Sequence, residues 1–189
     1  MKASNNRIKQ EKAKAFAPAT VGNIGVGFDL LGFSLGKIGD IVTASTVPIK
    51  TKAERSISQK VIVEDISGFS NGISYETNKN TAAFSVLKML QDLGIHETIY
   101  LQIDKGIPPG SGLGSSACSA VASVVAVNQM LENPLPQKEL FDYALHGESL
   151  ASGSFHGDNV GPSLLGGVVL TVLNHRSQII EMPYPSDLY

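Results

Sequence analysis

Hydrophobic and polar residues alternate with a period of two in several parts of the chain. β-Branched residues dominate segments 40–47 (DIVTASTV) and 60–66 (KVIVEDI), and apolar and polar positions alternate over 98–104 (TIYLQID). This pattern is typical of strands, so three strands are predicted there. A further strand is predicted over 166–173 (GGVVLTVL).

Other segments have helical spacing. Residues 78–94 predict a helix that stops at Gly94, and its apolar positions are Ala83, Val86, Leu87, Leu90 and Leu93. Residues 115–131 form a long, largely apolar run that predicts a buried helix, and residues 137–152 predict another. Because strands and helices interleave without a regular βαβ repeat, the pattern favours an α+β fold over a doubly wound sheet.

The composition of the chain argues against several classes of protein. The 189 residues suit one large domain or two small ones, and the net charge of −2 gives no general electrostatic reason to expect nucleic acid or an anionic membrane. No apolar stretch approaches the roughly 18–20 residues of a membrane span. The single cysteine, Cys118, excludes an intramolecular disulfide and a cysteine metal cluster, and its apolar surroundings favour a buried core position.

The N-terminal sequence is basic and polar, and no hydrophobic signal-peptide core follows it. We therefore expect residues 1–14 to form a flexible extension before a fold that begins near Ala15. Arginine is scarce in the extension and Glu11 is present, which favours a cytoplasmic location over an organellar address.

The segment IPPGSGLGSSA (residues 107–117) places Gly110, Gly112 and Gly114 within five positions. It follows a predicted strand and opens a predicted helix, where backbone N–H groups and the helix dipole converge on an anion. It is not a Walker A loop, because no Lys-Ser/Thr pair follows the last glycine. Its spacing also differs from the G-x-G-x-x-G dinucleotide fingerprint. The alternative is a flexible turn before a hydrophobic helix.

Residues on both sides of these glycines bear on that choice. Pro108 and Pro109 favour a shaped loop over a flexible turn, because proline restricts the backbone. Ser115 and Ser116 place two hydroxyls at the predicted helix N-terminus, where they would cap the helix or reach a metal ion.

Two other stretches concentrate glycine with polar residues. The first, PATVGNIGVGFDLLG (residues 18–32), carries Asn23 and Asp29; the second, residues 147–167, gathers Glu148, His156, Asp158 and Asn159. Helical spacing aligns Glu148 with Leu140 and Ala144, so its carboxylate is expensive to bury unless a cation, such as a divalent metal, satisfies it. The alternatives are an exposed helix end for Glu148, a structural histidine for His156, and a turn or helix cap for Asp158 and Asn159.

Taken together and in this order, the three stretches resemble the GHMP kinase superfamily of small-molecule kinases. The middle motif, P-x-G-x-G-L-G-S-S-A, matches residues 108–117, and the first motif and the segment HGDNVGPSLLGG look most like the homoserine kinase family. The resemblance covers residues 15–173. It implies a ribosomal protein S5 domain 2-like fold with a mixed or antiparallel sheet packed with helices.

The resemblance also implies ATP-dependent phosphorylation of L-homoserine to O-phospho-L-homoserine, a step toward threonine, with ATP and Mg²⁺ as cofactors. It implies Mg²⁺ ligation by Ser116 and Glu148 and an amino-acid pocket at Asn23, Asp29, His156 and Asn159. Nucleotide contacts are implied at Asn80 and Lys105 and along the glycine loop, at Pro108, Pro109, Gly110, Ser111, Gly112, Leu113, Gly114, Ser115, Ser116, Ala117, Cys118 and Ser119.

Relatives similar to mevalonate kinase use an aspartate as catalytic base in the segment that corresponds to Asp158 and Asn159 here. Asp158, beside Asn159, is therefore a candidate catalytic base, and the alternative is late deprotonation of the substrate hydroxyl without a base. Residues 15–189 are expected to form the N-terminal ATP-binding domain, with the family's C-terminal domain absent from this chain. The alternatives to a homoserine kinase are another GHMP small-molecule kinase, or a truncated nucleotide-binding module without turnover. A homo-oligomer, such as a dimer, is expected, because the missing domain would leave apolar surface exposed.

Overall fold

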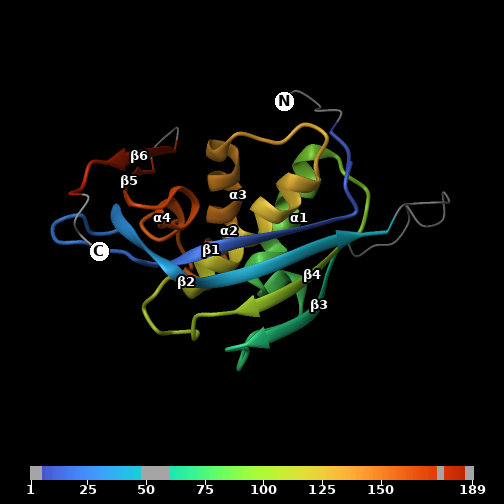
Figure 1. Cartoon of the computed structure of the whole chain (residues 1–189), viewed down its shortest axis with the longest axis horizontal. Coiled ribbons are helices and arrows are strands. Elements are labelled where there is room, and N and C mark those ends of the chain that lie inside the picture. Colours follow the sequence, from blue (N-terminus) through green and yellow to red (C-terminus); the bar gives the residue numbers. More distant parts are fainter. Residues whose placement is uncertain (1–5, 48–59, 174–176, 186–189) are drawn as a thin grey trace.

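The computed structural model describes residues 6–47, 60–173 and 177–185. Six strands form one sheet, and the helices cover one of its faces (Figure 1). The strands are β1 (Lys12–Val21), β2 (Leu31–Thr46), β3 (Val61–Gly68), β4 (Ile99–Lys105), β5 (Val168–Val172) and β6 (Gln178–Met182). The helices are the short 3₁₀ helix η2 (Thr77–Lys79), α1 (Thr81–Leu93), α2 (Ser115–Met130), α3 (Gln137–Ser152) and α4 (Val160–Leu165). The α+β fold expected from the sequence is confirmed.

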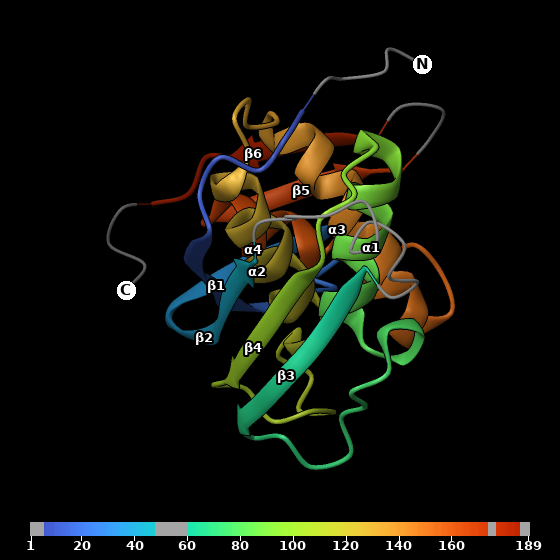
Figure 2. The same ribbon diagram turned by 90° about the vertical axis from the view of Figure 1, so that its right-hand side faces the viewer.

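The long strand β2 organises the sheet, whose order is β3-β4-β2-β5-β6, with β1 also paired to β2. β2 runs antiparallel to β1, β4 and β5, whereas β3 and β4 are parallel, so the sheet is mixed. Seen from the side, β3 and β4 lie in front of the helical layer (Figure 2). Because β4 and β5 both pair with β2, the end of β4 and the start of β5 lie beside the same strand.

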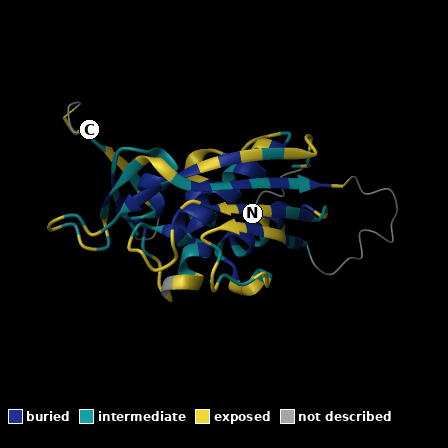
Figure 3. Ribbon diagram, turned by 60° about the horizontal axis from the view of Figure 1, so that its bottom comes forward, coloured by how far each residue is buried: buried dark blue, intermediate teal, exposed yellow. Residues whose placement is uncertain are grey.

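Helix α2 forms the centre of the core. It packs against β1 and β2 on one side and against α1 and α3 on the other, and most of its residues are buried. In β4 and in the second half of β2, buried residues alternate with more exposed ones, as expected for a sheet with one covered face (Figure 3). In the described parts of the chain, no helix combines the length and apolar character needed to cross a bilayer.

The predicted helices and strands match the structure where one period dominates a segment. Helix α3 has the predicted bounds, and Gly94 ends α1 in the left-handed conformation with φ of 66°. The strand expected over 166–173 is shorter, because Gly166 and Gly167 both have positive φ and form a turn before β5.

The expected extension at residues 1–14 needs correction where the structure describes it. β1 begins at Lys12, three residues before Ala15. Ile8 forms an isolated bridge with Leu131, and Arg7 pairs with Glu132 at 2.7 Å. Backbone hydrogen bonds and this ion pair hold the segment against the end of α2, whereas residues 1–5 lie outside the described residues.

Candidate active site

The glycine loop connects β4 to α2, and its three glycines have a conformational cause. Gly110, Gly112 and Gly114 have φ of 74°, 76° and 63°, in the left-handed region that glycine adopts more readily than other residues. At Gly114 there is also no room, since a Cβ would lie 2.1 Å from Oγ1 of Thr20. Around Gly110 and Gly112 the space is open. The loop therefore has a defined shape with accessible backbone at its tip.

The start of α2 carries no side-chain cap. Gly114 occupies the N-cap position. The sequence left open that Ser115 or Ser116 would cap the helix, and neither of them does so. Ser115 instead donates a hydrogen bond of 3.0 Å from Oγ to the carbonyl of Ile107. Backbone N–H groups at an uncapped helix start, next to a glycine loop, form an arrangement that favours anions.

A cavity of about 490 Å³ lies against this loop. Residues of the first glycine-rich stretch, the glycine loop, the start of α1 and the end of α3 all line it. The expected site residues in its wall are Asn23, Asn80, Lys105, Pro109, Gly110, Ser111, Gly112, Gly114, Ser115, Ser116, Ser119, Glu148 and Asn159. Those outside its lining are Asp29, Pro108, Leu113, Ala117, Cys118, His156 and Asp158. Three stretches distant in sequence thus meet at one cavity.

Glu148 is half-buried beside Ser116, so it is not the exposed helix end considered as an alternative. Burial raises the pKa of Glu148 above its ordinary value, whereas a hydrogen bond from the Ser116 side chain lowers it. The negative charge of Asp158 raises the pKa of Glu148 further. A hydroxyl and a carboxylate next to a phosphate-type loop are oxygen ligands that suit Mg²⁺, and a cation would offset the cost of burying this charge.

Asp158 and Asn159 lie just before α4 and contact the first glycine-rich stretch. Asp158 is 2% exposed, and its Oδ2 accepts a hydrogen bond of 3.0 Å from the backbone N–H of Asn23. Burial raises the pKa of Asp158, and this backbone hydrogen bond opposes the shift. Asn159 accepts a hydrogen bond of 2.9 Å from Oγ1 of Thr20, and its side chain does not cap α4.

The remaining residues of the expected amino-acid pocket lie next to one another. Oδ1 of Asn23 accepts a hydrogen bond of 2.8 Å from the backbone N–H of Asp29, and both residues have positive φ. Nε2 of His156 lies 3.8 Å from Oδ2 of Asp29 and 3.0 Å from Oγ of Ser154. His156 and Asp29 are each partly exposed, outside the lining of the cavity.

Asn80 and Cys118 are occupied by structural contacts. The Asn80 side chain caps α1 by accepting a bond from the Ala83 N–H, and its Nδ2 donates to the Ser74 carbonyl at 2.8 Å. Cys118 is fully buried, in agreement with the expected core position, and its Sγ donates to the Pro18 carbonyl. The side chain of Cys118 therefore belongs to the core and does not line the cavity.

The chain is similar in sequence and fold to known proteins. The model of the GHMP kinases N terminal domain matches residues 80–167. Homoserine kinase of Xylella fastidiosa is 44% identical over 90% of this chain and 50% of its own length, and that of Chloroherpeton thalassium is 38% identical over 95% and 56%. The crystal structure of homoserine kinase from Cytophaga hutchinsonii superposes with a TM-score of 0.82 at 40% identity, covering 95% of this chain and 54% of that one.

The chain is a homologue of the homoserine kinases and carries a GHMP kinase N-terminal domain. It spans about half the length of the curated relatives it matches. The matched domain runs from the start of α1 to the turn before β5, so it includes the glycine loop, Glu148 and Asn159.

Two buried polar residues beside the site, Thr20 and Asp40, were not predicted from the sequence. Thr20 is fully buried between Gly114 and Asn159, and Asp40 is fully buried against Lys105. The sequence did contain a pattern that indicates burial of Asp40, because this residue continues the alternation of buried positions at Val42 and Ala44 along β2. A carboxylate in that series indicates a buried partner.

Proposed function

We propose that this homoserine kinase homologue performs ATP-dependent phosphorylation of L-homoserine to O-phospho-L-homoserine. The observation that carries the proposal is the convergence of the glycine loop, the Ser116–Glu148 pair and Asn23 with Asn159 on one cavity. Phosphoryl transfer depends chiefly on positioning and charge neutralisation, and this set of residues suits both tasks.

The chain's own residues divide these tasks. The backbone of residues 108–114 and the start of α2 would hold the phosphates of ATP, because N–H groups at a helix N-terminus favour anions. Ser116 and Glu148 would hold Mg²⁺, which when bound neutralises charge on the phosphates. Within the described residues no group of three or more His, Cys, Asp or Glu side chains could hold a metal ion. Phosphate oxygens and water would therefore complete the coordination.

On the substrate side, Asp29 would accept hydrogen bonds from the homoserine ammonium, with Asn23, His156 and Asn159 holding its carboxylate or hydroxyl. Asp158 is our candidate base: burial raises its pKa, which makes its carboxylate a better proton acceptor for the substrate hydroxyl. In the alternative without a base, the hydroxyl proton leaves late in a loose transition state. A homodimer and a cytoplasmic location stay predictions from the sequence.

The proposal is tested by incubating the chain with ATP, Mg²⁺ and homoserine, and measuring ADP release together with phosphohomoserine by mass spectrometry. Mevalonate in place of homoserine is the control. We expect homoserine-dependent ADP release and none with mevalonate. Turnover of mevalonate instead would identify another GHMP kinase activity. ATP binding without turnover, when a polypeptide spanning the full length of the relatives is also inactive, would indicate a nucleotide-binding module.

A further inference from the structure

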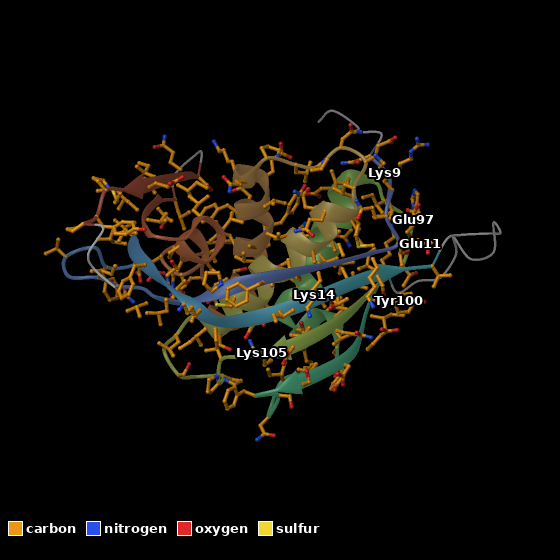
Figure 4. All side chains as sticks on the ribbon, viewed as in Figure 1. Lys9, Glu11, Lys14, Glu97, Tyr100 and Lys105 are labelled. Carbon is orange, nitrogen blue, oxygen red and sulfur yellow. The ribbon has the colours of Figure 1, made fainter. Side chains whose placement is uncertain are left out.

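Two buried charges lie directly beneath the glycine loop. Asp40 in β2 is fully buried, and Lys105 at the end of β4 is 3% exposed. Each continues the buried series of its strand, Asp40 with Val42 and Lys105 with Ile103. Both side chains therefore face the helical layer, and Lys105 lies beside β2 at the end of β4 (Figure 4).

The hydrogen bonds around the pair form a closed set. Nζ of Lys105 pairs with Oδ2 of Asp40 and donates to the Ser115 carbonyl at 2.8 Å and to Oγ of Ser119 at 2.7 Å. Ser119 in turn donates to Oδ2 of Asp40 at 2.7 Å, and the backbone N–H of Gly106 donates to Oδ1 at 3.0 Å. All three protons of the ammonium and both carboxylate oxygens are therefore in use.

These contacts join the two ends of the loop. Gly106 is the first residue after β4, and Ser115 is the first residue of α2. The backbones approach closely at this point as well, because a Cβ on Gly106 would lie 2.0 Å from the Gly39 carbonyl oxygen. Between these ends, the Ser111 N–H donates to the Pro108 carbonyl at 3.3 Å and the Thr20 N–H donates to the Leu113 carbonyl at 3.1 Å. Gly110 and Gly112 at the tip have positive φ and open space around them, so the shape of the tip depends in part on how the two ends are held.

A buried ion pair is a poor device for stability, because the desolvation of two charges offsets their attraction. An apolar pair would fill the same space at similar stability, whereas fixed hydrogen bonds set distances and angles. We propose that Asp40 is a positioning residue for the glycine loop, and that Lys105 acts through the loop rather than by contact with the phosphates. This inference rests on the proposed function, in which the loop binds ATP.

The test compares Asp40→Asn, Lys105→Met and the double variant by calorimetric titration with ATP and Mg²⁺. We expect each single variant to weaken ATP binding by about tenfold, the equivalent of one lost hydrogen bond to a charged group. The double variant should bind ATP no more weakly than either single variant, because Asp40 and Lys105 belong to the same hydrogen-bonded cluster. If Lys105 contacts the phosphates directly, Asp40→Asn frees it and ATP binding stays the same or tightens, which overturns the proposal. Wild-type affinity in both single variants overturns it too.

A variant that leaves one buried charge without its partner can fail to fold. Two further variants, at uncharged residues, therefore complete the experiment. Ser119→Ala removes the hydroxyl between Lys105 and Asp40, and Ser123→Ala removes a buried hydroxyl one turn along α2 that donates to the Ala82 carbonyl instead. We expect Ser119→Ala to weaken ATP binding roughly three- to tenfold and Ser123→Ala to leave it unchanged. Equal effects of the two variants would overturn the positioning role.

Hydrogen exchange of the loop amides separates this inference from the proposed function. We expect residues 107–114 to exchange faster in Ser119→Ala than in Ser123→Ala, and any faster exchange of α1 to appear only in Ser123→Ala, whose lost hydroxyl donates to the Ala82 carbonyl in that helix. If the wild-type chain does not bind ATP, the proposed function fails, and the exchange rates alone decide whether the cluster holds the loop. Equal loop exchange in the two variants would then reject the inference.

Discussion

The backbone N–H of Asn23 donates a hydrogen bond of 3.0 Å to Oδ2 of Asp158, a residue 135 positions further along the chain. The bond holds the first glycine-rich stretch against the segment that precedes α4. It requires Gly22, because a Cβ at that position would lie 2.0 Å from the same oxygen. One side of the candidate site is therefore built by a close approach between two distant segments.

The first prediction concerns this approach. Gly22→Ala should lower the free energy of unfolding by about 1–3 kcal/mol, because the added methyl group displaces the Asp158 carboxylate. In an Asp158→Ala background the obstructing oxygen is gone, so the same substitution should cost less, with a coupling energy of about 1 kcal/mol. Chemical denaturation of the two single variants and the double variant measures this. Strict additivity would contradict the contact.

The second prediction concerns the loop backbone. Gly112→Val should weaken ATP binding by about tenfold, because a β-branched residue at φ of 76° reshapes the loop. Gly36 is a matched control in β2, with φ of 65° and equally open space around it. Both substitutions should cost about 1–2 kcal/mol of stability through backbone strain. An unchanged ATP affinity in Gly112→Val would remove the loop from the nucleotide site.

The third prediction concerns Mg²⁺. Glu148→Gln should reduce the Mg²⁺-dependent gain in ATP affinity by about tenfold, because the amide lacks the charge that complements the cation. Stability should not fall, since burial raises the pKa of Glu148 and thus disfavours its charged form. Glu139→Gln, on the exposed first turn of the same helix, is the control. Identical Mg²⁺ titrations for the wild type and Glu148→Gln would exclude Glu148 as a ligand.

The fourth prediction uses Cys118, the chain's single cysteine. Burial raises the pKa of Cys118 to about 12, so the thiol is protonated near neutral pH and is also inaccessible. Because the thiolate is the nucleophile, iodoacetamide should leave the folded chain unmodified and alkylate it fully in denaturant. Mass spectrometry of both samples checks this. Rapid alkylation of the folded chain would show that the core around the start of α2 is open.

The sequence predicted the fold best where a segment's own residues determine its structure. The bounds of α3 follow from helical spacing alone. β1 was missed because its buried apolar positions are Ala15, Ala17 and Ala19, which have little strand propensity, and Pro18 interrupts the pattern. That strand forms because it pairs along nearly the whole of β2, a tertiary contact that local patterning does not contain.

The residues of the candidate site were likewise predictable from the sequence only in part. Motif spacing identified the three stretches, and the geometry brings their Asn23, Ser116, Glu148 and Asn159 to one cavity. Lys105 was expected near the nucleotide, but the sequence could not reveal its partner. Asp40 is 65 positions away, and the two charges meet only because β2 and β4 pair in register.

The last prediction separates a substrate role for Asp29 from a structural one. Its side chain is 38% exposed near His156, and its backbone N–H donates a hydrogen bond to Asn23. Asparagine tolerates the positive φ of this position, so Asp29→Asn removes the charge without new backbone strain. The KM for homoserine should rise by about ten- to a hundredfold, while the KM for ATP stays near wild type.

These constants are measured on a polypeptide spanning the full length of the relatives, together with a melting curve. Asp92→Asn, an exposed aspartate on α1, is the matched control and should change neither KM. If Asp29 only supports the turn, its substitution lowers the melting temperature and raises both KM values alike. A selective rise for homoserine would assign Asp29 to the amino-acid pocket with its neighbours Asn23 and His156, because a general loss of stability would raise both KM values.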